Sequence, residues 1–153
     1  MTDDTPWLAP LRDAVAARPA GATLALLADY RPDLARQMAH ALGLGFVDCR
    51  QAWLSALGWQ AHTLGLETLT QRLREAMDAE GRGLVAFNSE ALLATKPAAE
   101  RRAWLAGLTA RTWPAPLVLP LTVYADEAPE VAGVCDLRGM ALPEQSFLNR
   151  LAF

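Results

Sequence analysis

Short apolar runs alternating with amphipathic segments constrain the fold of this chain more than any other feature. The first run, at 22–30, stays apolar until Asp29, and the others lie at 45–49, 83–88, 115–127 and 133–140. Buried parallel strands read as continuous apolar runs and are joined by helical crossovers. We therefore expect an α/β fold, a single three-layer α/β/α domain over 1–153 with a mostly parallel sheet of four or five strands.

Helical spacing of apolar residues marks the segments between these runs. Helices are predicted within 5–21, 31–45, 66–83, 96–113 and 142–153. The segment 50–65 is poorly periodic and predicts a short helix around Trp53 and Leu57, followed by a loop. Pro120 removes one donor from the hydrogen-bond ladder of its strand, so that strand is expected at a sheet edge or with a bulge.

The composition predicts a packed cytoplasmic protein. Apolar residues make up 52% of the 153 residues, the formal net charge is −3 and the pI is near 5.3, so direct nucleic-acid binding is disfavoured. The two cysteines have no metal-binding spacing, and no apolar stretch reaches the roughly 20 residues that span a bilayer. The acidic start does not resemble a signal peptide.

The stretch "ALLADYRPDLARQ" (25–37) lies where a mononucleotide-binding protein carries its phosphate loop. Such a loop needs glycines that aim backbone N–H groups at phosphate, together with a lysine and a hydroxyl. Here the turn has neither glycine nor lysine. Asp29 would repel an anion, Pro32 lacks an N–H group, and Arg31 compensates only weakly. The sequence therefore predicts no triphosphate site and no cofactor.

Three carboxylates near predicted strand ends offer a different chemistry. Asp29, Asp48 and Glu90 could converge at the carboxyl edge of the sheet and hold Mg²⁺, which takes oxygen ligands. That arrangement would suit a nuclease or phosphotransferase. Acids at strand ends also cap the following helix or face solvent, and no paired-carboxylate spacing is present. The magnesium enzyme is the alternative hypothesis, not the preferred one.

Cys49 could be a nucleophile paired with His40 or His62. It follows a strand and precedes a helix start, a position that can lower the pKa of a thiol. No family signature for a Cys-His enzyme surrounds it, and buried inert thiols are much commoner.

Two groups of large apolar residues are candidates for contact with a partner. Trp53 and Trp59 lie in the poorly periodic segment, and exposed aromatic side chains anchor interfaces. Phe147 and Leu151, with Leu148 between them, would form a stripe on the last predicted helix.

The later half of the chain resembles a known family. "GLVAFNSEALL" (83–93) is similar to a Walker B strand and the helix that follows it, with Asn88 and Glu90 at comparable places. "LTVYADEAPE" (121–130) resembles a C-terminal element of the small P-loop subunit of bacteriophage-exclusion (BREX) defence systems. This resemblance implies a P-loop NTPase or RecA-like fold.

The chain departs from that family at both nucleotide motifs. "ADYRPDLAR" (28–36) replaces the glycine-lysine loop, and Asn88 replaces the usual aspartate. The RecA-like cell-division inhibitors of the SOS response are a similar case, because they lack the loop and bind another protein. We therefore expect a degenerate relative that is not an enzyme. It would be a non-catalytic accessory or regulatory protein, in phage defence or DNA metabolism, that binds a protein partner or itself.

Overall fold

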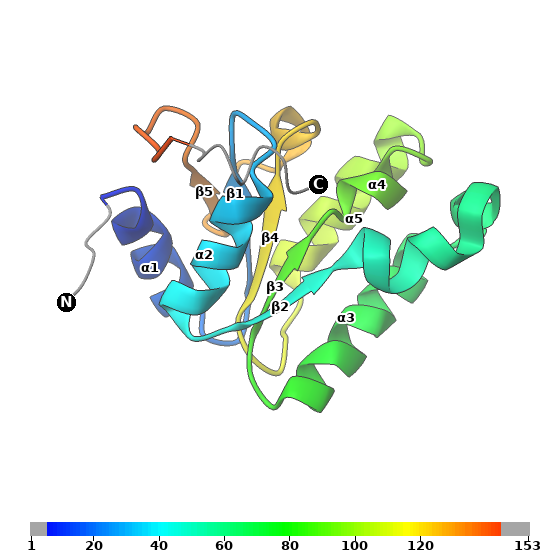
Figure 1. The fold of residues 1–153 in the computed structure, drawn as a ribbon, viewed down its shortest axis with the longest axis horizontal. Helices are drawn as coiled ribbons and strands as arrows, with labels where there is room; N and C mark the ends of the chain where they lie inside the picture. The colour runs from blue at the N-terminus through cyan, green and yellow to red at the C-terminus, as the bar shows by residue number, and fades with distance from the viewer. Residues whose placement is uncertain (1–5, 145–153) are drawn as a thin grey trace.

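The computed structural model describes residues 6–144 and contains a five-stranded, fully parallel sheet (Figure 1). The strand order is β2-β3-β4-β1-β5. The strands are β1 (Ala22–Leu26), β2 (Gly45–Asp48), β3 (Leu84–Phe87), β4 (Leu117–Leu121) and β5 (Val134–Asp136). The predicted α/β class and the parallel sheet are both confirmed.

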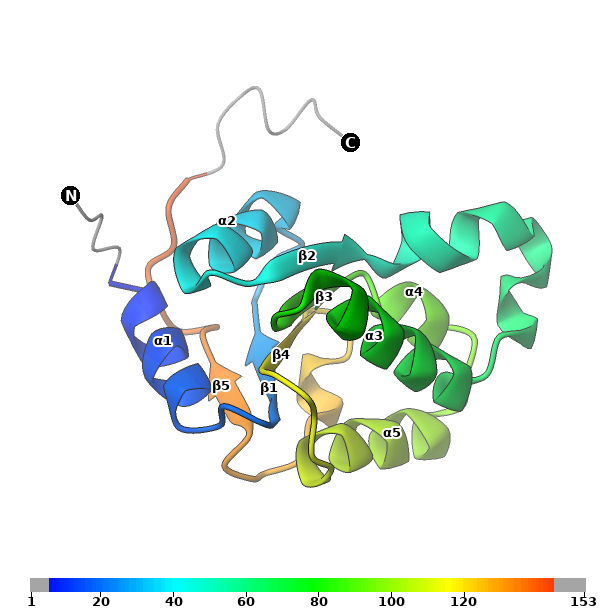
Figure 2. The same cartoon turned by 90° about the horizontal axis from the view of Figure 1, so that it is seen from below.

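Helices cover both faces of the sheet (Figure 2). On one face lie α1 (Leu8–Ala16) and α2 (Pro32–Leu42), and on the other lie α3 (Leu66–Glu80), α4 (Glu90–Leu93) and α5 (Ala98–Ala110). Each face has its own buried apolar cluster against the sheet. The predicted three-layer α/β/α arrangement is therefore present.

The boundaries of α2 follow from two residues. Pro32 occupies its first turn, where the missing N–H group removes no helical hydrogen bond. Gly43 ends it with φ 68°, the left-handed conformation that side chains with a Cβ atom disfavour. The turn before α2 therefore starts a regular helix without any glycine-rich loop.

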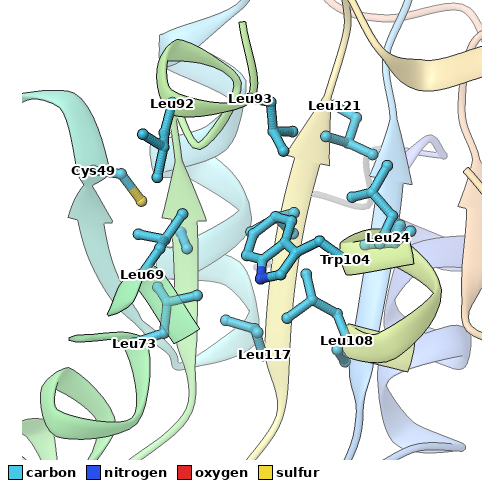
Figure 3. Close-up of a cluster of buried hydrophobic side chains, with 14 of the residues drawn as sticks. Leu24, Cys49, Leu69, Leu73, Leu92, Leu93, Trp104, Leu108, Leu117 and Leu121 are labelled. Carbon is cyan, nitrogen blue, oxygen red and sulfur yellow. The ribbon is translucent and has the colours of Figure 1, made fainter. Parts of the chain in front are cut away.

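The core beneath α3, α4 and α5 is rich in leucine and contains two tryptophans, Trp104 and Trp113. Figure 3 shows the part around Trp104. Trp104 of α5 lies over the sheet, and its indole N–H donates to Thr70 Oγ1 at 2.9 Å. The buried tryptophan thus keeps its polar atom satisfied by a neighbouring helix. Cys49 lies in the same cluster, beside Leu69 and Leu92 in this view.

The prediction that the proline-containing strand lies at a sheet edge is wrong. β4 pairs with both β1 and β3 in the middle of the sheet. The Leu117 N–H donates toward β1, so alternation turns the Pro120 nitrogen toward β3. Pairing of β4 with β3 ends at Val118, two residues before the proline. The proline is tolerated because its side of the ladder has already ended.

Residues 50–63, called the arm below, differ from the predicted short helix and loop. They form a π-helical turn at Arg50–Leu54, followed by a 3-10 segment at Ser55–Thr63. Gly58 breaks the second segment with φ 55° and ψ −129°. The arm projects from the body of the molecule between β2 and α3 (Figures 1 and 2). The helix predicted over 142–153 lies mostly outside the described residues.

Candidate functional site

The turn between β1 and α2 is closed by an ion pair. Arg31 donates two hydrogen bonds to the Asp33 carboxylate, at 3.0 and 2.9 Å, and a third to the Pro143 carbonyl oxygen at 2.7 Å. Hydrogen bonding to Asp33 raises the pKa of Arg31, so the guanidinium stays charged. Three of its five N–H donors are used inside the protein. The turn therefore offers an anion neither a glycine loop nor an unpaired cation.

Asp48 serves as a local cap at the end of β2. Its Oδ1 accepts hydrogen bonds from the backbone N–H groups of Arg50 and Gln51, at 3.0 and 3.3 Å. The same oxygen accepts the Asn88 side-chain amide at 2.9 Å. Asn88 has φ 65°, a conformation that asparagine tolerates better than most residues. Asn88 thus connects the ends of β2 and β3 through its amide.

Glu90 binds backbone rather than a ligand. Both carboxylate oxygens accept the Thr122 N–H at 3.0 Å, and one accepts the Tyr124 N–H at 2.7 Å. Burial raises the pKa of Glu90, and these N–H donors oppose that shift. The side chain therefore holds the chain after β4 in place from the start of α4.

The three carboxylates that could have formed a magnesium site are used separately. Asp48 caps the start of the arm, Glu90 holds the chain after β4, and Asp29 is exposed in the turn before α2. Within residues 6–144, no group of three or more His, Cys, Asp or Glu side chains could hold a metal ion. The convergence that the magnesium hypothesis required is absent from this part of the chain.

Cys49 has the properties of a core thiol. It is fully buried, and burial raises its pKa, the reverse of the shift that a nucleophile needs. His62 is exposed on the arm, where its Nδ1 lies 2.8 Å from the Trp59 carbonyl oxygen. His40 is exposed on α2. Cys49 directly precedes the helical turn of the arm, but its packing among leucines favours the inert buried thiol over the nucleophile.

The chain after β4 is held by further contacts that sequence reasoning missed. Arg101 of α5 donates to both Glu127 carboxylate oxygens, at 2.7 and 2.8 Å, and its guanidinium carbon lies 4.3 Å from the Tyr124 ring centroid. Arg138, after β5, pairs with Asp126 at 2.6 Å. No local spacing links these residues, because 26 and 12 positions separate the paired side chains.

The arm carries the most exposed aromatic side chain among the described residues. Trp59 is 81% exposed, and its ring stacks on His62 with centroids 6.3 Å apart. The 3-10 segment contains no buried residue. Trp53, the other tryptophan predicted to face a partner, is half-buried and packs against the core. Phe147 and Leu151 lie outside the described residues.

Comparison with known proteins adds no relative. No protein-family model matches the chain, and no curated protein is significantly similar to it. None of the helices within residues 6–144 has both the length and the apolar character needed to cross a membrane. The chemistry of the described side chains therefore carries the functional argument.

Proposed function

We propose that this chain is a non-catalytic accessory or regulatory protein that acts by binding another protein or a second copy of itself. The arm is the contact surface in this proposal. The single observation that carries it is Trp59, a large ring that is 81% exposed on a projecting segment with no buried residue. Exposed tryptophans are costly to leave in water and frequently anchor interfaces.

The accompanying proposal is a degenerate P-loop-like scaffold. The strand order β5-β1-β4-β3-β2 supports it. In this order β1 lies between β4 and β5, which resembles the sheet of RecA-like P-loop proteins. The turn after β1 also supports the loss of phosphate binding, because Arg31 donates hydrogen bonds to Asp33 and to the Pro143 carbonyl oxygen. The proposed setting in phage defence or DNA metabolism rests on the resemblance to the BREX subunit at 83–93 and 121–130.

Substitution of Trp59 tests the contact surface. Three baits are compared in the native host: the wild-type chain, Trp59→Ser and Gln60→Ser. The proteins that each bait captures are quantified by mass spectrometry. Gln60 is an exposed polar residue on the same segment and provides the matched control. We expect Trp59→Ser alone to lose a specific partner, or to abolish self-association measured by light scattering. Equal capture and equal mass for all three proteins would contradict the proposal.

Thermal melting tests the loss of nucleotide binding. A ligand that binds the native state raises the melting temperature by mass action. We expect ATP with Mg²⁺ to leave the melting temperature unchanged. A concentration-dependent rise would show that the scaffold still binds nucleotide and would contradict the non-catalytic assignment.

A further inference from the structure

A cavity of about 650 Å³ opens beside the carboxyl ends of β1 and β5. Leu26 and Asp136, the last residues of these two strands, form one wall, and the connection from β4 to β5 forms the other. Its volume falls within the range of roughly 300–1,000 Å³ that is typical of ligand sites. Ligands of open parallel sheets bind beyond the carboxyl ends of the strands, where this cavity lies.

The polar lining of the cavity is dominated by carboxylates. Its lining contains three carboxylates and one cation: Asp126, Glu130, Asp136 and Arg138. Arg138 is shared between two of them, at 2.9 Å from Asp136 and 2.6 Å from Asp126. Hydrogen bonds from Arg138 lower the pKa of Asp136 to about 2, so this acid is ionised at neutral pH. Three carboxylates and one guanidinium leave a negative lining, which favours a cation.

Glu130 is the carboxylate that Arg138 does not neutralise. It is exposed, and no ion pair or side-chain hydrogen bond is formed by it within residues 6–144. It lies beside Val131, which is 50% exposed, and Pro129. An unpaired acid thus stands next to apolar side chains in the same cavity, so a complementary group would carry a positive charge beside an apolar surface.

The wall that carries two of these acids is held from outside the cavity. Glu90 fixes the backbone at Thr122 and Tyr124, and Arg101 fixes Glu127. Neither Glu90 nor Arg101 lines the cavity. A binding wall positioned before its ligand arrives loses less conformational entropy on binding.

We propose that this cavity binds an arginine side chain, flanked by apolar residues, of a partner protein. The guanidinium pairs with Glu130 while the apolar flanks cover Val131 and Pro129. The inference rests on the proposed function only in taking its ligand from a protein, since the arm does not line the cavity. Charge complementarity selects the cation, and the apolar lining selects a peptide segment over a free ion.

Titration of the ¹⁵N-labelled full chain tests the proposal by NMR. The probe is the peptide acetyl-Ala-Leu-Arg-Leu-Ala-amide, and its control carries citrulline, a neutral isostere, in place of arginine. We expect saturable shifts confined to the amides around 125–138 and a dissociation constant of about 1 mM. The citrulline peptide should bind about fivefold more weakly, the upper end for one exposed ion pair. Equal binding of the two peptides, shifts elsewhere or no saturable shift would overturn the proposal.

Variants assign the effect to the cavity. Glu130→Gln should weaken the arginine peptide about fivefold and leave the citrulline peptide unchanged. Asp78→Asn, at an exposed acid on α3, is the matched control and should change neither. Trp59→Ser should also bind normally, so failure of the arm hypothesis is distinguishable from failure of this one. Propylguanidinium, a free compound with the single charge of the arginine side chain, should bind more weakly than the peptide, and equal binding would overturn the assignment to a protein segment.

Discussion

The chain after β4 and the arm are both irregular segments, but they are held very differently. Three side chains from other parts of the fold contact Thr122–Ala128: Glu90, Arg101 and Arg138. The arm is capped by Asp48 at its start and tied by one hydrogen bond from Lys96 to the His62 carbonyl oxygen near its end. Between these contacts its 3-10 segment contains no fully buried residue.

This difference separates residues that serve stability from residues that do not. Both ionic side chains within Thr122–Ala128, Asp126 and Glu127, have a partner within the protein, so their presence is explained by folding. Trp59 has no such explanation, because an exposed ring contributes little to the native state. Trp59 is therefore the residue that we assign to the proposed contact surface.

Removing Glu90 should have the largest effect. Glu90→Ala leaves the N–H groups of Thr122 and Tyr124 without their acceptor, and we expect a loss of about 3 kcal/mol in the free energy of unfolding. Urea denaturation measures it, with Glu75→Ala at an exposed position of α3 as the control. A loss below about 0.5 kcal/mol would show that this segment is not anchored as described.

Proteolysis compares the two segments directly. Chymotrypsin cleaves after aromatic residues. The arm offers the half-buried Trp53 and the exposed Trp59, and the chain after β4 offers Tyr124. We expect cleavage after Trp59 to be roughly tenfold faster or more, because exposed and weakly packed backbone opens at lower free energy. Mass spectrometry of early digests measures the rates. First cleavage after Tyr124 in the wild-type chain would reverse the comparison.

The pH dependence of stability provides a smaller effect. Burial raises the pKa of Glu90 above its ordinary value of 4.5, so the folded protein binds this proton more tightly than the unfolded chain does. Its contribution is fully present below pH 4.5 and is lost as the pH rises through the folded-state pKa. The free energy of unfolding of the wild type minus that of Glu90→Gln should therefore fall over this interval. A constant or rising difference would contradict the direction of the shift.

Replacing Trp59 should have the smallest effect on stability. Trp59→Ser should change the free energy of unfolding by no more than about 0.5 kcal/mol, as is usual for exposed positions away from the core. Urea denaturation of the isolated protein measures this. A loss of more than about 1 kcal/mol would mean that the ring packs against the body and would remove the argument for a contact role.

The sheet was predictable because its strands carry local signals. Continuous apolar runs mark buried parallel strands, and residues such as Pro32 and Gly43 mark helix ends through backbone geometry alone. The position of Pro120 was not predictable in this way. Whether a strand lies at an edge depends on which strands flank it, and local sequence does not record that order.

The roles of the candidate site residues were likewise predictable only where they depend on local sequence. Sequence placed Asp48 and Glu90 near strand ends and left both capping and metal binding open. Capping of the arm by Asp48 follows from local geometry, whereas Glu90 depends on Thr122, 32 residues away. Cys49 is the buried thiol that general frequencies favour, but its burial arises from helices distant in sequence.

By itself, the sequence determined the α/β class, the parallel sheet and the lack of a glycine-lysine phosphate loop after the first strand. These properties depend on residue type and spacing within a single segment. Only the tertiary structure decided which acids accept hydrogen bonds from backbone N–H groups and which tryptophan is exposed. It also decided that Asp126, Glu130 and Asp136 line the same cavity. Charges and surfaces acquire their roles from neighbours that only the folded chain brings together.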